Sequence, residues 1–348
     1  MPTPVAIIGS SGYSGAELAR LIARSPAFEL TAAYSDRQKG EPLGKSVSGL
    51  GRSGALVVRP QAEAARAYEH ASLVALATPA EVSLELAPKL VSGGARVIDL
   101  SGAFRIADRD VFKQYYGFEH REPELLAQAR YALPQISAAS GKQAPSIAHT
   151  RLVSNPGCYA TAAILALAPL LHHRLIEPRG IFVDGKSGVS GAGRKLAEQF
   201  LFMEVAENLS AYRVADHQHT PEIELALSRV ASAEVTITFA PHLLSIRRGL
   251  VATCYARATE AADLAQLLAR VTDYYAGSAQ LEGAPVVFVG SVEEASVASV
   301  WSTPLARVGI AGDARTRGVV AAGAIDNLLK GAASQALENM LAMVEATP

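Results

Sequence analysis

Near its N-terminus the chain reads Val5-Ala6-Ile7-Ile8-Gly9-Ser10-Ser11-Gly12-Tyr13-Ser14-Gly15, and this stretch decides the fold. The uninterrupted apolar run predicts a strand that is buried on both faces. Three glycines follow at intervals of three, and a helical pattern continues over Ala16–Ala23. Glycines here allow a tight turn, a close approach of the backbone to a pyrophosphate and close packing of the helix. The stretch therefore predicts the start of an α/β, Rossmann-type dinucleotide-binding domain.

Strand and helix patterns go on alternating through the first part of the chain. We expect strands over Leu30–Tyr34, Leu73–Ala77 and Ala95–Leu100, and a helix over Glu81–Leu90. Such alternation is typical of a parallel, doubly wound sheet. Arg37–Gly54 contains five glycines and is predicted to run over the surface.

The pattern changes after Cys158. Well-separated stretches predict strands over Ile181–Asp184, Glu234–Phe239, Leu250–Ala256 and Val286–Val289, with long helices between them. We therefore expect a second, α+β domain built on a mostly antiparallel sheet.

The C-terminal segment from Asp326-Asn327 to Met343 has a capping residue followed by a helical apolar stripe. We expect this last helix to pack back on the first domain. The predicted dinucleotide-binding domain accordingly covers residues 1–155 and 326–348, and the predicted catalytic domain covers residues 156–325.

Composition narrows the class of protein. The chain has 348 residues, of which 49% are hydrophobic and 19% are charged, and its formal net charge is −1. These values are typical of a globular enzyme and indicate neither a nucleic-acid-binding nor a membrane-binding surface. No apolar run reaches the roughly 18 residues of a membrane span, and no signal peptide is recognisable. Only two cysteines are present, so we expect no disulfide framework and a reducing, cytoplasmic location.

One of these cysteines lies in Ser154-Asn155-Pro156-Gly157-Cys158-Tyr159, directly before an apolar helical run. A thiol in the first turn of a helix faces unpaired backbone N–H groups and the positive end of the helix dipole. Both favour the thiolate, which is the nucleophilic form. A thiolate beside a nicotinamide suggests acyl-thioester redox chemistry. Cys254, inside an apolar strand, is predicted to be buried and inert.

The end of the second strand, Tyr34-Ser35-Asp36-Arg37, bears on the choice of cofactor. An acidic residue at this point usually binds the ribose hydroxyls of NAD. Ser35 and Arg37 can instead bind a 2′-phosphate, which favours NADP. Asp36 would favour NAD if its side chain pointed toward the ribose, and a solvated turn without ligand contacts is the remaining alternative.

A second cluster, Asp216-His217-Gln218-His219-Thr220-Pro221-Glu222-Ile223, carries two histidines. Zinc sites usually need three or four ligands, so we expect no metal here. A histidine is suited to proton transfer near neutral pH. His172 and His173, at a predicted helix end, are interpreted as surface residues.

Several cationic residues are candidates for binding an anion. Lys186-Ser187-Gly188-Val189-Ser190-Gly191-Ala192-Gly193-Arg194 combines glycines with Lys, Ser and Arg donors, which suits a phosphate or substrate loop. Arg105 and Arg248 are further candidates, and for each of them a structural role is an equal alternative.

Taken together, these motifs resemble the N-acetyl-γ-glutamyl-phosphate reductase family of the semialdehyde dehydrogenase superfamily, and the resemblance covers nearly the whole chain. It rests on the order and spacing of the glycine motif, Asp99-Leu100-Ser101 with Phe104-Arg105, the Cys158 and His217–Ile223 motifs, the Lys186–Arg194 loop, and Ile325-Asp326-Asn327-Leu328.

The resemblance implies NADPH-dependent reduction of N-acetyl-γ-glutamyl phosphate in arginine biosynthesis, with Cys158 as the nucleophile. It also implies that the histidine loop supplies the acid/base, with His217 as our first choice and His219 as our second, and that the enzyme is a homo-oligomer. We expect the cofactor to be bound by Gly9, Ser11, Gly12, Tyr13, Ser14, Gly15, Ser35, Arg37, Gly188 and Asn327. We expect the substrate to be bound by Ser101, Arg105, Asn155, Lys186, Ser187, Arg194, Glu222 and Arg248.

The chain departs from the family pattern at three places. Gln135 stands where the family often has Glu, Ser245 stands where it often has Pro, and Trp301-Ser302-Thr303-Pro304 replaces a Gly-Ser/Thr-Asn element. These changes bear on the acyl chain more than on the reaction. The alternatives are an aminoadipyl or carrier-protein-linked acyl phosphate, aspartate-semialdehyde dehydrogenase activity, and a non-enzymatic NADP sensor whose Cys158 is unreactive.

Overall fold

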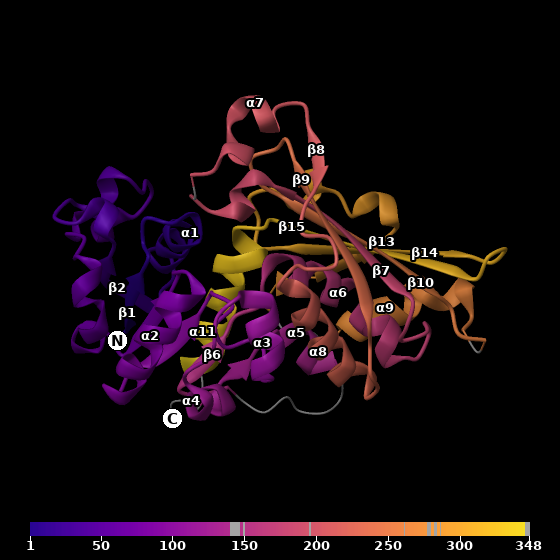
Figure 1. Ribbon diagram of the computed structural model, residues 1–348, viewed down its shortest axis with the longest axis horizontal. Coiled ribbons are helices and arrows are strands. Elements are labelled where there is room, and N and C mark those ends of the chain that lie inside the picture. The colour runs from indigo at the N-terminus through magenta and orange to yellow at the C-terminus, as the bar shows by residue number, and fades with distance from the viewer. Residues whose placement is uncertain are drawn as a thin grey trace. The chain divides into compact units, whose positions relative to one another are not determined.

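The computed structural model describes residues 1–139, 147–148, 150–194, 196–260, 262–276, 280–281, 284–285 and 287–344. They belong to two compact units (Figure 1). The first unit comprises Met1–Ala132, Pro145–Gly157 and Ala332–Pro348, and the second comprises Leu133–Ala144 and Cys158–Gly331. The chain thus changes unit directly before Cys158 and again directly after Gly331.

The first unit is built on a six-stranded sheet in which every pair of neighbours is parallel. The strand order is β2-β1-β3-β4-β6-β5. Chain order reverses between β1 and β3, which is where doubly wound sheets bind their ligands. The predicted parallel, doubly wound sheet is confirmed. The strands are β1 (Thr3–Ile8), β2 (Phe28–Tyr34), β3 (Leu73–Leu76), β4 (Arg96–Asp99), β5 (Arg130–Tyr131) and β6 (Leu152–Ser154).

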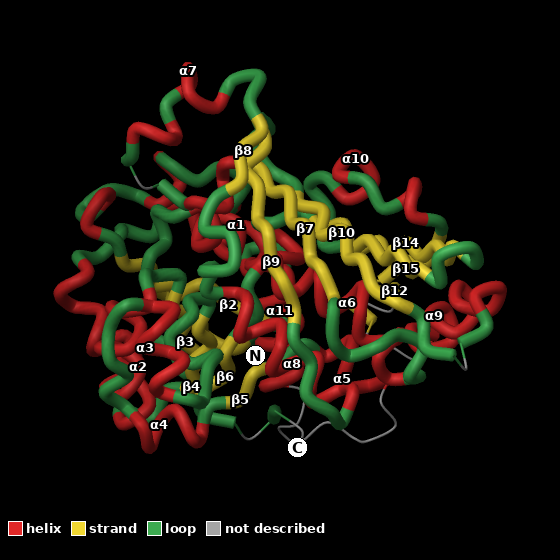
Figure 2. Tube along the Cα trace, turned by 45° about the vertical axis from the view of Figure 1, so that its right-hand side comes forward, coloured by secondary structure: helices red, strands yellow, loops and turns green. Residues whose placement is uncertain are grey.

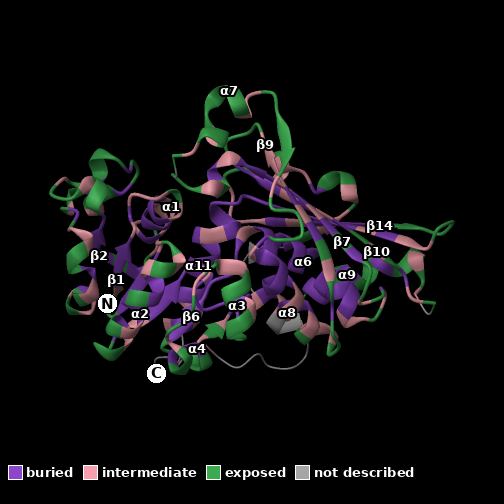
Figure 3. Ribbon diagram, viewed as in Figure 1, coloured by how far each residue is buried: buried purple, intermediate pink, exposed green. Residues whose placement is uncertain are grey.

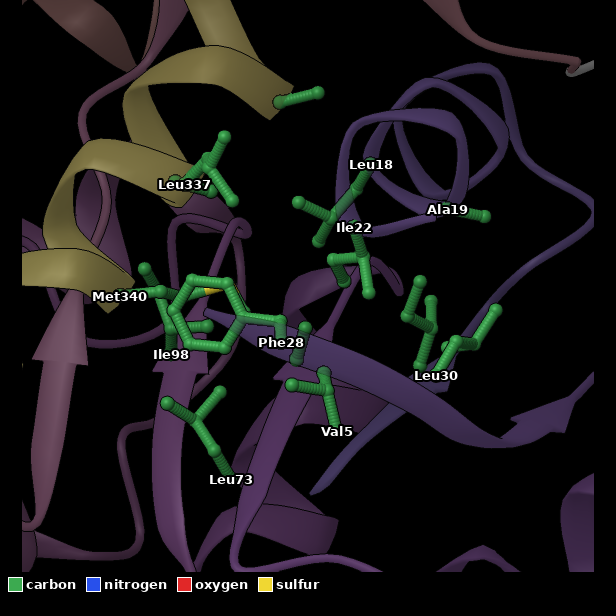
Figure 4. Close-up of a cluster of buried hydrophobic side chains, with 14 of the residues drawn as sticks. Val5, Leu18, Ala19, Ile22, Phe28, Leu30, Leu73, Ile98, Leu337 and Met340 are labelled. Atoms are coloured by element: carbon green, nitrogen blue, oxygen red, sulfur yellow. The ribbon is translucent and has the colours of Figure 1, made fainter. Parts of the chain in front are cut away.

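Two layers cover the faces of this sheet. Helices α1 (Tyr13–Ile22) and α11 (Ser334–Val344) share one core with alternate strand residues such as Val5 and Ile7. Figure 4 shows Leu337 and Met340 of α11 in this core, near Ile22 of α1. On the other face, Ala6 and Ile8 pack with α2 (Ala80–Ser92) and the 3-10 helix η4 (Gln61–Glu69). The short helices α3 (Arg109–Tyr116) and α4 (Pro123–Gln128) complete the unit.

The prediction that Arg37–Gly54 runs over the surface is wrong in part. The segment forms short 3-10 turns at Asp36–Gln38, Leu43–Lys45 and Gly51–Ala55. Leu43, Val47 and Leu50 are buried in the core that α1 and α11 share. The glycines suggested a surface loop. Three apolar side chains nevertheless anchor the segment, because burying them removes apolar surface from water.

The second unit is built on a seven-stranded sheet in the order β13-β14-β15-β10-β7-β9-β8 (Figure 2). Of its neighbouring pairs only β13 with β14 and β7 with β9 are parallel. The predicted mostly antiparallel sheet is confirmed. The strands are β7 (Ile181–Gly188), β8 (Leu209–Ala211), β9 (Ile237–Leu244), β10 (Leu250–Arg257), β13 (Val287–Gly290), β14 (Ala306–Asp313) and β15 (Gly318–Ile325); β11 (Gln280–Leu281) and β12 (Ala284–Pro285) form a separate pair.

Helix α6 (Cys158–His172) crosses one face of this sheet, beside α8 (His219–Ala231) and α9 (Leu267–Ala276). Every residue from 159 to 171 is buried (Figure 3). Pro169 has no N–H to donate to the carbonyl of Leu165, and the Tyr275 hydroxyl donates to that carbonyl instead, at 2.6 Å. This hydrogen bond satisfies the buried carbonyl of Leu165 and stabilises the helix that begins with Cys158.

Helix α6 ends in two histidines that are less exposed than the sequence indicated. His172 and His173 are half-buried, and their rings lie 5.4 and 6.1 Å from the ring of Tyr274. Burial lowers the pKa of His173. The interpretation as surface residues is therefore wrong, because α9 packs against the end of α6.

The other face of the second sheet exposes large apolar side chains. Phe182 and Tyr255, which are paired across β7 and β10, are 54% and 44% exposed. Phe288 of β13 and Leu209 of β8 are also exposed. The remaining short elements are α5 (Pro134–Ala139), η5 (Val189–Ala192), η6 (Glu198–Phe200), α7 (Phe202–Val205), η7 (Leu264–Gln266), η8 (Val292–Glu294), α10 (Val297–Val300) and a π-helical turn (Leu329–Ala333).

Within the described ranges of the chain, no helix is long and apolar enough to span a membrane.

Candidate active site

The glycine turn at the carboxyl end of β1 fits a dinucleotide. Gly9 has a φ of +87°, and a Cβ there would lie 2.3 Å from the carbonyl oxygen of Ala77. A Cβ at Gly15 would lie 2.4 Å from the carbonyl oxygen of Gly9. Only glycine fits either position. No side chain of the described chain caps the start of α1 at Gly12, and a helix N-terminus of this kind favours an anion such as a pyrophosphate.

The end of β2 lies beside this turn. The Ser35 hydroxyl donates to the Ser11 hydroxyl at 2.7 Å, and Ser35 is buried. The Asp36 carboxylate accepts the Gln61 N–H at 3.0 Å, at the start of η4. Arg37 is exposed. The carboxylate that would favour NAD is thus held by the protein backbone, and a serine and an arginine flank it.

The carboxyl ends of β4 and β6 carry three of the predicted substrate residues. The Ser101 hydroxyl donates to the Asp99 carboxylate at 2.9 Å, and burial raises the pKa of Asp99. Arg105 donates to the carbonyls of Leu100 and Asn155, each at 2.9 Å. Arg105 therefore links the turn after β4 to the segment that leads to Cys158.

Asn155 is also held within the first unit. The side-chain amide of Asn339 on α11 donates to Asn155 Oδ1 at 3.0 Å. Asn155 Nδ2 donates to the carbonyl of Ala332 at 3.3 Å. Three residues before Cys158, the chain is thus fixed by α11 through a buried amide pair.

Cys158 is the first residue of α6, as predicted, and its side chain is half-buried. It forms no disulfide. Cys254, by contrast, is fully buried, and burial raises the pKa of its thiol to about 12. Only Cys158 combines partial exposure with a helix N-terminus, which is the environment that favours a reactive thiolate.

Both histidines of the second cluster pack against Tyr159, the residue that follows Cys158. The Tyr159 ring lies 5.8 Å from the His217 ring and 6.1 Å from the His219 ring, and the two imidazoles are 4.8 Å apart. The Tyr159 hydroxyl donates to the carbonyl of His242 at 2.9 Å. Packing of α6 on α8 thus brings the predicted nucleophile and the predicted acid/base residues to one region of the second unit.

The two histidines differ electrostatically. Burial, together with the nearby His219 and Arg213, lowers the pKa of His217 to about 2. The backbone N–H of His219 donates to His217 Nδ1 at 3.1 Å, so neutral His217 carries its proton on Nε2. His219 Nε2 lies 4.0 Å from a carboxylate oxygen of the buried Glu222. His217 is held neutral, whereas His219 has an acidic neighbour.

Lys186 lies on the face of the sheet opposite to α6. A Cβ at Gly185 would lie 2.5 Å from the Tyr159 ring, so Gly185 faces α6 and its neighbours Asp184 and Lys186 face away. Lys186 Nζ lies 2.5 Å from one oxygen of the Asp184 carboxylate, and His242 Nδ1 lies 3.1 Å from the other. This ion cluster occupies the open face of the sheet.

The predicted anion loop is shorter than expected, because β7 continues through Gly188. Ser187 is buried, and its hydroxyl donates to the carbonyl of Gly188 at 3.2 Å. A Cβ at Gly188 would lie 2.8 Å from the backbone of Arg248, so the strand packs tightly there. Arg194, at the end of the loop, is exposed.

Arg248 and Asn327 are engaged with the protein itself. Arg248 forms a buried ion pair with Asp326, with Nε 2.7 Å and Nη2 2.8 Å from the two carboxylate oxygens. Asn327 Oδ1 accepts the Gly249 N–H at 2.7 Å, and Asn327 Nδ2 donates to Ser190 at 3.0 Å. These contacts support the structural alternative for Arg248.

Sequence reasoning missed the contributions of Tyr159, Asp326 and Gly331. Tyr159 supports both histidines, and Asp326 pairs with Arg248. Gly331 faces the nucleophile, since a Cβ there would lie 2.7 Å from the Cys158 Cβ. The capping signal of Asp326 was visible in the sequence, but its partner, 78 residues away, was not.

The described residues contain no cluster of three or more His, Cys, Asp or Glu side chains that could hold a metal ion.

Comparison with known proteins identifies the family. Residues 4–144 match the semialdehyde dehydrogenase NAD-binding domain, and residues 158–327 match the semialdehyde dehydrogenase dimerisation domain. The N-acetyl-gamma-glutamyl-phosphate reductase of Pelotomaculum thermopropionicum is 40% identical over 340 residues, covering 98% of this chain and 94% of the relative. The protein of that name from Geobacillus stearothermophilus is 42% identical over 342 residues, covering 98% and 95%.

Solved structures agree on the fold. The aspartate semialdehyde dehydrogenase II of Vibrio cholerae has a TM-score of 0.73 at 17% identity, covering 100% of both chains. The NADP-bound aspartate semialdehyde dehydrogenase of Candida albicans has a TM-score of 0.71 at 14% identity, covering 99% of both chains. At this identity the likeness concerns the fold alone. The sequence relatives decide the family, and the chain belongs to the N-acetyl-γ-glutamyl-phosphate reductases of the semialdehyde dehydrogenase superfamily.

Proposed function

We propose that the protein reduces N-acetyl-γ-glutamyl phosphate to N-acetylglutamate 5-semialdehyde and phosphate, with NADPH as the reductant, in arginine biosynthesis. The observation that carries the proposal is the arrangement at the start of α6, where Cys158 is followed by a tyrosine that packs against His217 and His219. The names of the relatives at about 40% identity support the substrate. The first unit binds the cofactor in this proposal, and the second supplies the chemistry.

The cofactor is NADP(H) in this proposal. The glycine turn and the N-terminus of α1 bind the pyrophosphate, since the glycines place no side chain in its way and a helix N-terminus favours an anion. Ser35 and Arg37 bind the 2′-phosphate, because Asp36 is already engaged with Gln61. A guanidinium and a hydroxyl suit a phosphate, whereas an available carboxylate would repel it.

Cys158 begins the reaction as a thiolate. It attacks the carbonyl carbon of the acyl phosphate, the C–O bond to the phosphate breaks, and phosphate leaves with the bonding electrons. A thioester on Cys158 remains. The positive end of the α6 dipole lies at Cys158, so it can stabilise both the thiolate and the oxyanion that forms during attack.

When bound, the dinucleotide would supply the hydride that reduces the thioester carbonyl. The tetrahedral carbon then carries an oxygen that needs a proton and a C–S bond that must break. Cys158 leaves as a thiolate when the C–S bond breaks, and the aldehyde is released. A histidine holds and returns the proton during these steps.

Between the two histidines, which the sequence alone does not separate, we favour His219 for the proton transfer over our first choice, His217. Burial keeps His217 neutral far below physiological pH. The buried Glu222 carboxyl lies 4.0 Å from His219 Nε2, where it can orient the imidazole for proton transfer. His217 instead accepts the His219 N–H, and thereby fixes its neighbour's backbone.

The three departures from the family pattern lie in hydrogen bonds within the chain or in buried positions. Gln135 is fully buried, Ser245 accepts the Glu207 N–H at 3.1 Å, and the Ser302 N–H donates to Asp326 at 2.8 Å. None of these contacts points to a longer or carrier-linked acyl chain.

The match to a dimerisation domain indicates oligomerisation. In our proposal two copies associate through the open face of the second sheet, which exposes Phe182, Tyr255 and Phe288. Burying apolar area of this kind drives association. Tyr255→Glu is then expected to shift the sedimentation coefficient toward the monomer, and an unchanged coefficient would place the interface elsewhere.

A reducing compartment such as the cytoplasm keeps Cys158 as a thiol.

The reverse reaction tests the proposed function. Purified protein is mixed with N-acetylglutamate semialdehyde, NADP and phosphate, and NADPH absorbance is followed, with Cys158→Ala alongside. We expect NADPH formation that requires both phosphate and Cys158. Signal only with aminoadipate or aspartate semialdehyde would keep the mechanism and change the substrate. No signal with any of the three aldehydes would contradict the enzymatic function and favour an NADP sensor.

A further inference from the structure

Gly331 lies against the predicted nucleophile, within the second unit. A Cβ at position 331 would come within 2.7 Å of the Cys158 Cβ and 3.2 Å of both the Cys158 Cα and the Ile325 Cδ1. Ordinary carbon contacts lie at about 3.5–4.0 Å. The position therefore admits no side chain without displacing Cys158 or the turn that carries Gly331.

That turn has an unusual backbone. Leu329–Ala333 is π-helical, a rare conformation that is frequent at functional sites. The carbonyl of Asp326 accepts the Gly331 N–H at 3.0 Å, and the Asp326 carboxylate accepts the N–H groups of Leu328 and Leu329 at 3.0 and 3.2 Å. Asp326 thus fixes the turn by both its backbone and its side chain.

Asp326 is fixed in turn by buried partners. Its carboxylate forms the ion pair with Arg248 and accepts the Ser302 N–H at 2.8 Å. Asp326 is completely buried, and Arg248 is 6% exposed. A buried pair of this kind is costly to break on one side, because the remaining charge is left uncompensated. The pair therefore gives the turn one well-defined position.

We propose that Gly331 is a positioning residue for Cys158, and that Arg248 acts through Asp326 to hold Gly331 in place rather than by binding substrate. The close contact at Gly331 fixes where the Cys158 Cβ lies relative to the first N–H groups of α6. Those N–H groups favour the thiolate. The catalytic meaning of this inference rests on the proposed function, but the positioning itself is measurable on the thiol alone.

Gly331→Ala tests the positioning. We measure the rate of alkylation of Cys158 by iodoacetamide as a function of pH, identify the labelled peptide by mass spectrometry, and measure kcat and KM in the reverse reaction. A displaced thiol should be alkylated more slowly near neutral pH, with its apparent pKa shifted upward. A misplacement of about 1 Å costs about 100-fold in kcat. The KM for NADP should stay within error.

Gly309→Ala is the matched control. A Cβ at Gly309 of β14 would lie 2.5 Å from the carbonyl oxygen of Ser291, so it creates a comparable clash that does not involve Cys158. It should lower the melting temperature without changing the alkylation profile. The double variant Gly331→Ala/Ile325→Val removes the Ile325 Cδ1 contact, and is expected to recover part of the alkylation rate. Wild-type alkylation and kcat in folded Gly331→Ala would overturn the proposal.

Arg248→Lys distinguishes a positioning role of Arg248 from a role in substrate binding. It also tests the proposal if Gly331→Ala does not fold. Lysine keeps the charge but loses the two-point contact with Asp326. Positioning predicts slower alkylation and a lower kcat, with little change in the KM for the aldehyde. A raised aldehyde KM with unchanged alkylation would show that Arg248 binds substrate, and would overturn its assigned role.

The outcomes also separate this inference from the proposed function. If Gly331→Ala slows alkylation while Cys158→Ala retains turnover, Gly331 positions a thiol that is not the nucleophile, and the proposed function fails. If Cys158→Ala is inactive and Gly331→Ala alkylates like the wild type, the function stands and the positioning fails.

Discussion

The two units carry their functional groups in different ways. In the first unit, the predicted dinucleotide site is a single contiguous backbone motif at the end of β1, and its glycines serve by lacking side chains. In the second unit, side chains from separate segments are brought together around α6, namely Cys158, His217, His219, Arg248 and Asp326. A backbone site can be recognised from its local spacing, whereas a side-chain site depends on long-range pairs.

This difference predicts a separation of kinetic effects. Changes at Cys158, His217, His219, Arg248 or Asp326 should lower kcat and leave the cofactor KM unchanged, because they alter reacting groups or their position. Changes at the end of β2 should alter the cofactor KM and leave kcat unchanged. A changed cofactor KM in the first group of variants, or a changed kcat in the second, would contradict this separation.

Replacement of the histidines should give the largest effect among changes that leave Cys158 and its supporting turn intact. His219→Asn is expected to lower kcat by about 10²–10⁴-fold, because it removes the group that transfers the proton. His217→Asn should have a smaller effect, since burial already holds His217 neutral. Steady-state kinetics of both variants check this order. A larger loss in His217→Asn would restore His217 as the acid/base.

Arg37→Ala tests the cofactor side of the comparison. Loss of a charge-assisted bond to the 2′-phosphate costs about 1.5–3 kcal/mol, so the KM for NADPH should rise about 10–100-fold. The KM for NADH should barely change, because NADH has no 2′-phosphate. Parallel titrations with both cofactors measure the ratio. An equal rise for NADH and NADPH would refute the assigned role of Arg37.

The smallest expected effect is on the pH dependence of the free energy of unfolding. The pKa of His217 is about 2 in the folded protein, below the unfolded value of about 6.5, so the unfolded state binds more protons between these values. Stability is therefore lost as pH falls below about 6.5. Between pH 7 and pH 5 this linkage amounts to about 2 kcal/mol, which His217→Gln should remove. Urea unfolding at both pH values checks this, and an equal loss in wild type and variant would contradict the neutral, buried state of His217.

The sequence predicted the parallel sheet well because its strands are apolar and β-branched runs with helices between them. It did not predict β14 and β15. Gly318–Ile325 reads GVVAAGAI, which has low strand propensity over its second half. The small residues are there for packing, since a Cβ at Gly323 would lie 2.1 Å from the Ala162 carbonyl oxygen on α6. Tertiary contact, rather than local preference, decides this strand.

In the candidate site, too, the sequence predicts local patterns but not contacts between distant residues. The nucleophile, the histidine pair and the glycine turn follow from local patterns that the chemistry requires. Arg248 was a candidate for binding an anion. The sequence alone does not distinguish an exposed arginine from a buried arginine that is paired with a carboxylate. The last helix was predicted to start near Asp326, but α11 begins at Ser334, because the π-helical turn beside Cys158 precedes it.

The most direct test of the central claim is a single-turnover measurement of the thioester. Wild-type protein is mixed rapidly with N-acetylglutamate semialdehyde and NADP in the absence of phosphate, and the quenched protein is analysed by mass spectrometry. The account predicts a burst of NADPH equal to the amount of protein, an acyl adduct on Cys158, and sustained turnover once phosphate is added. A burst without an adduct on Cys158, or the same burst in Cys158→Ala, would contradict the assignment of Cys158 as the nucleophile.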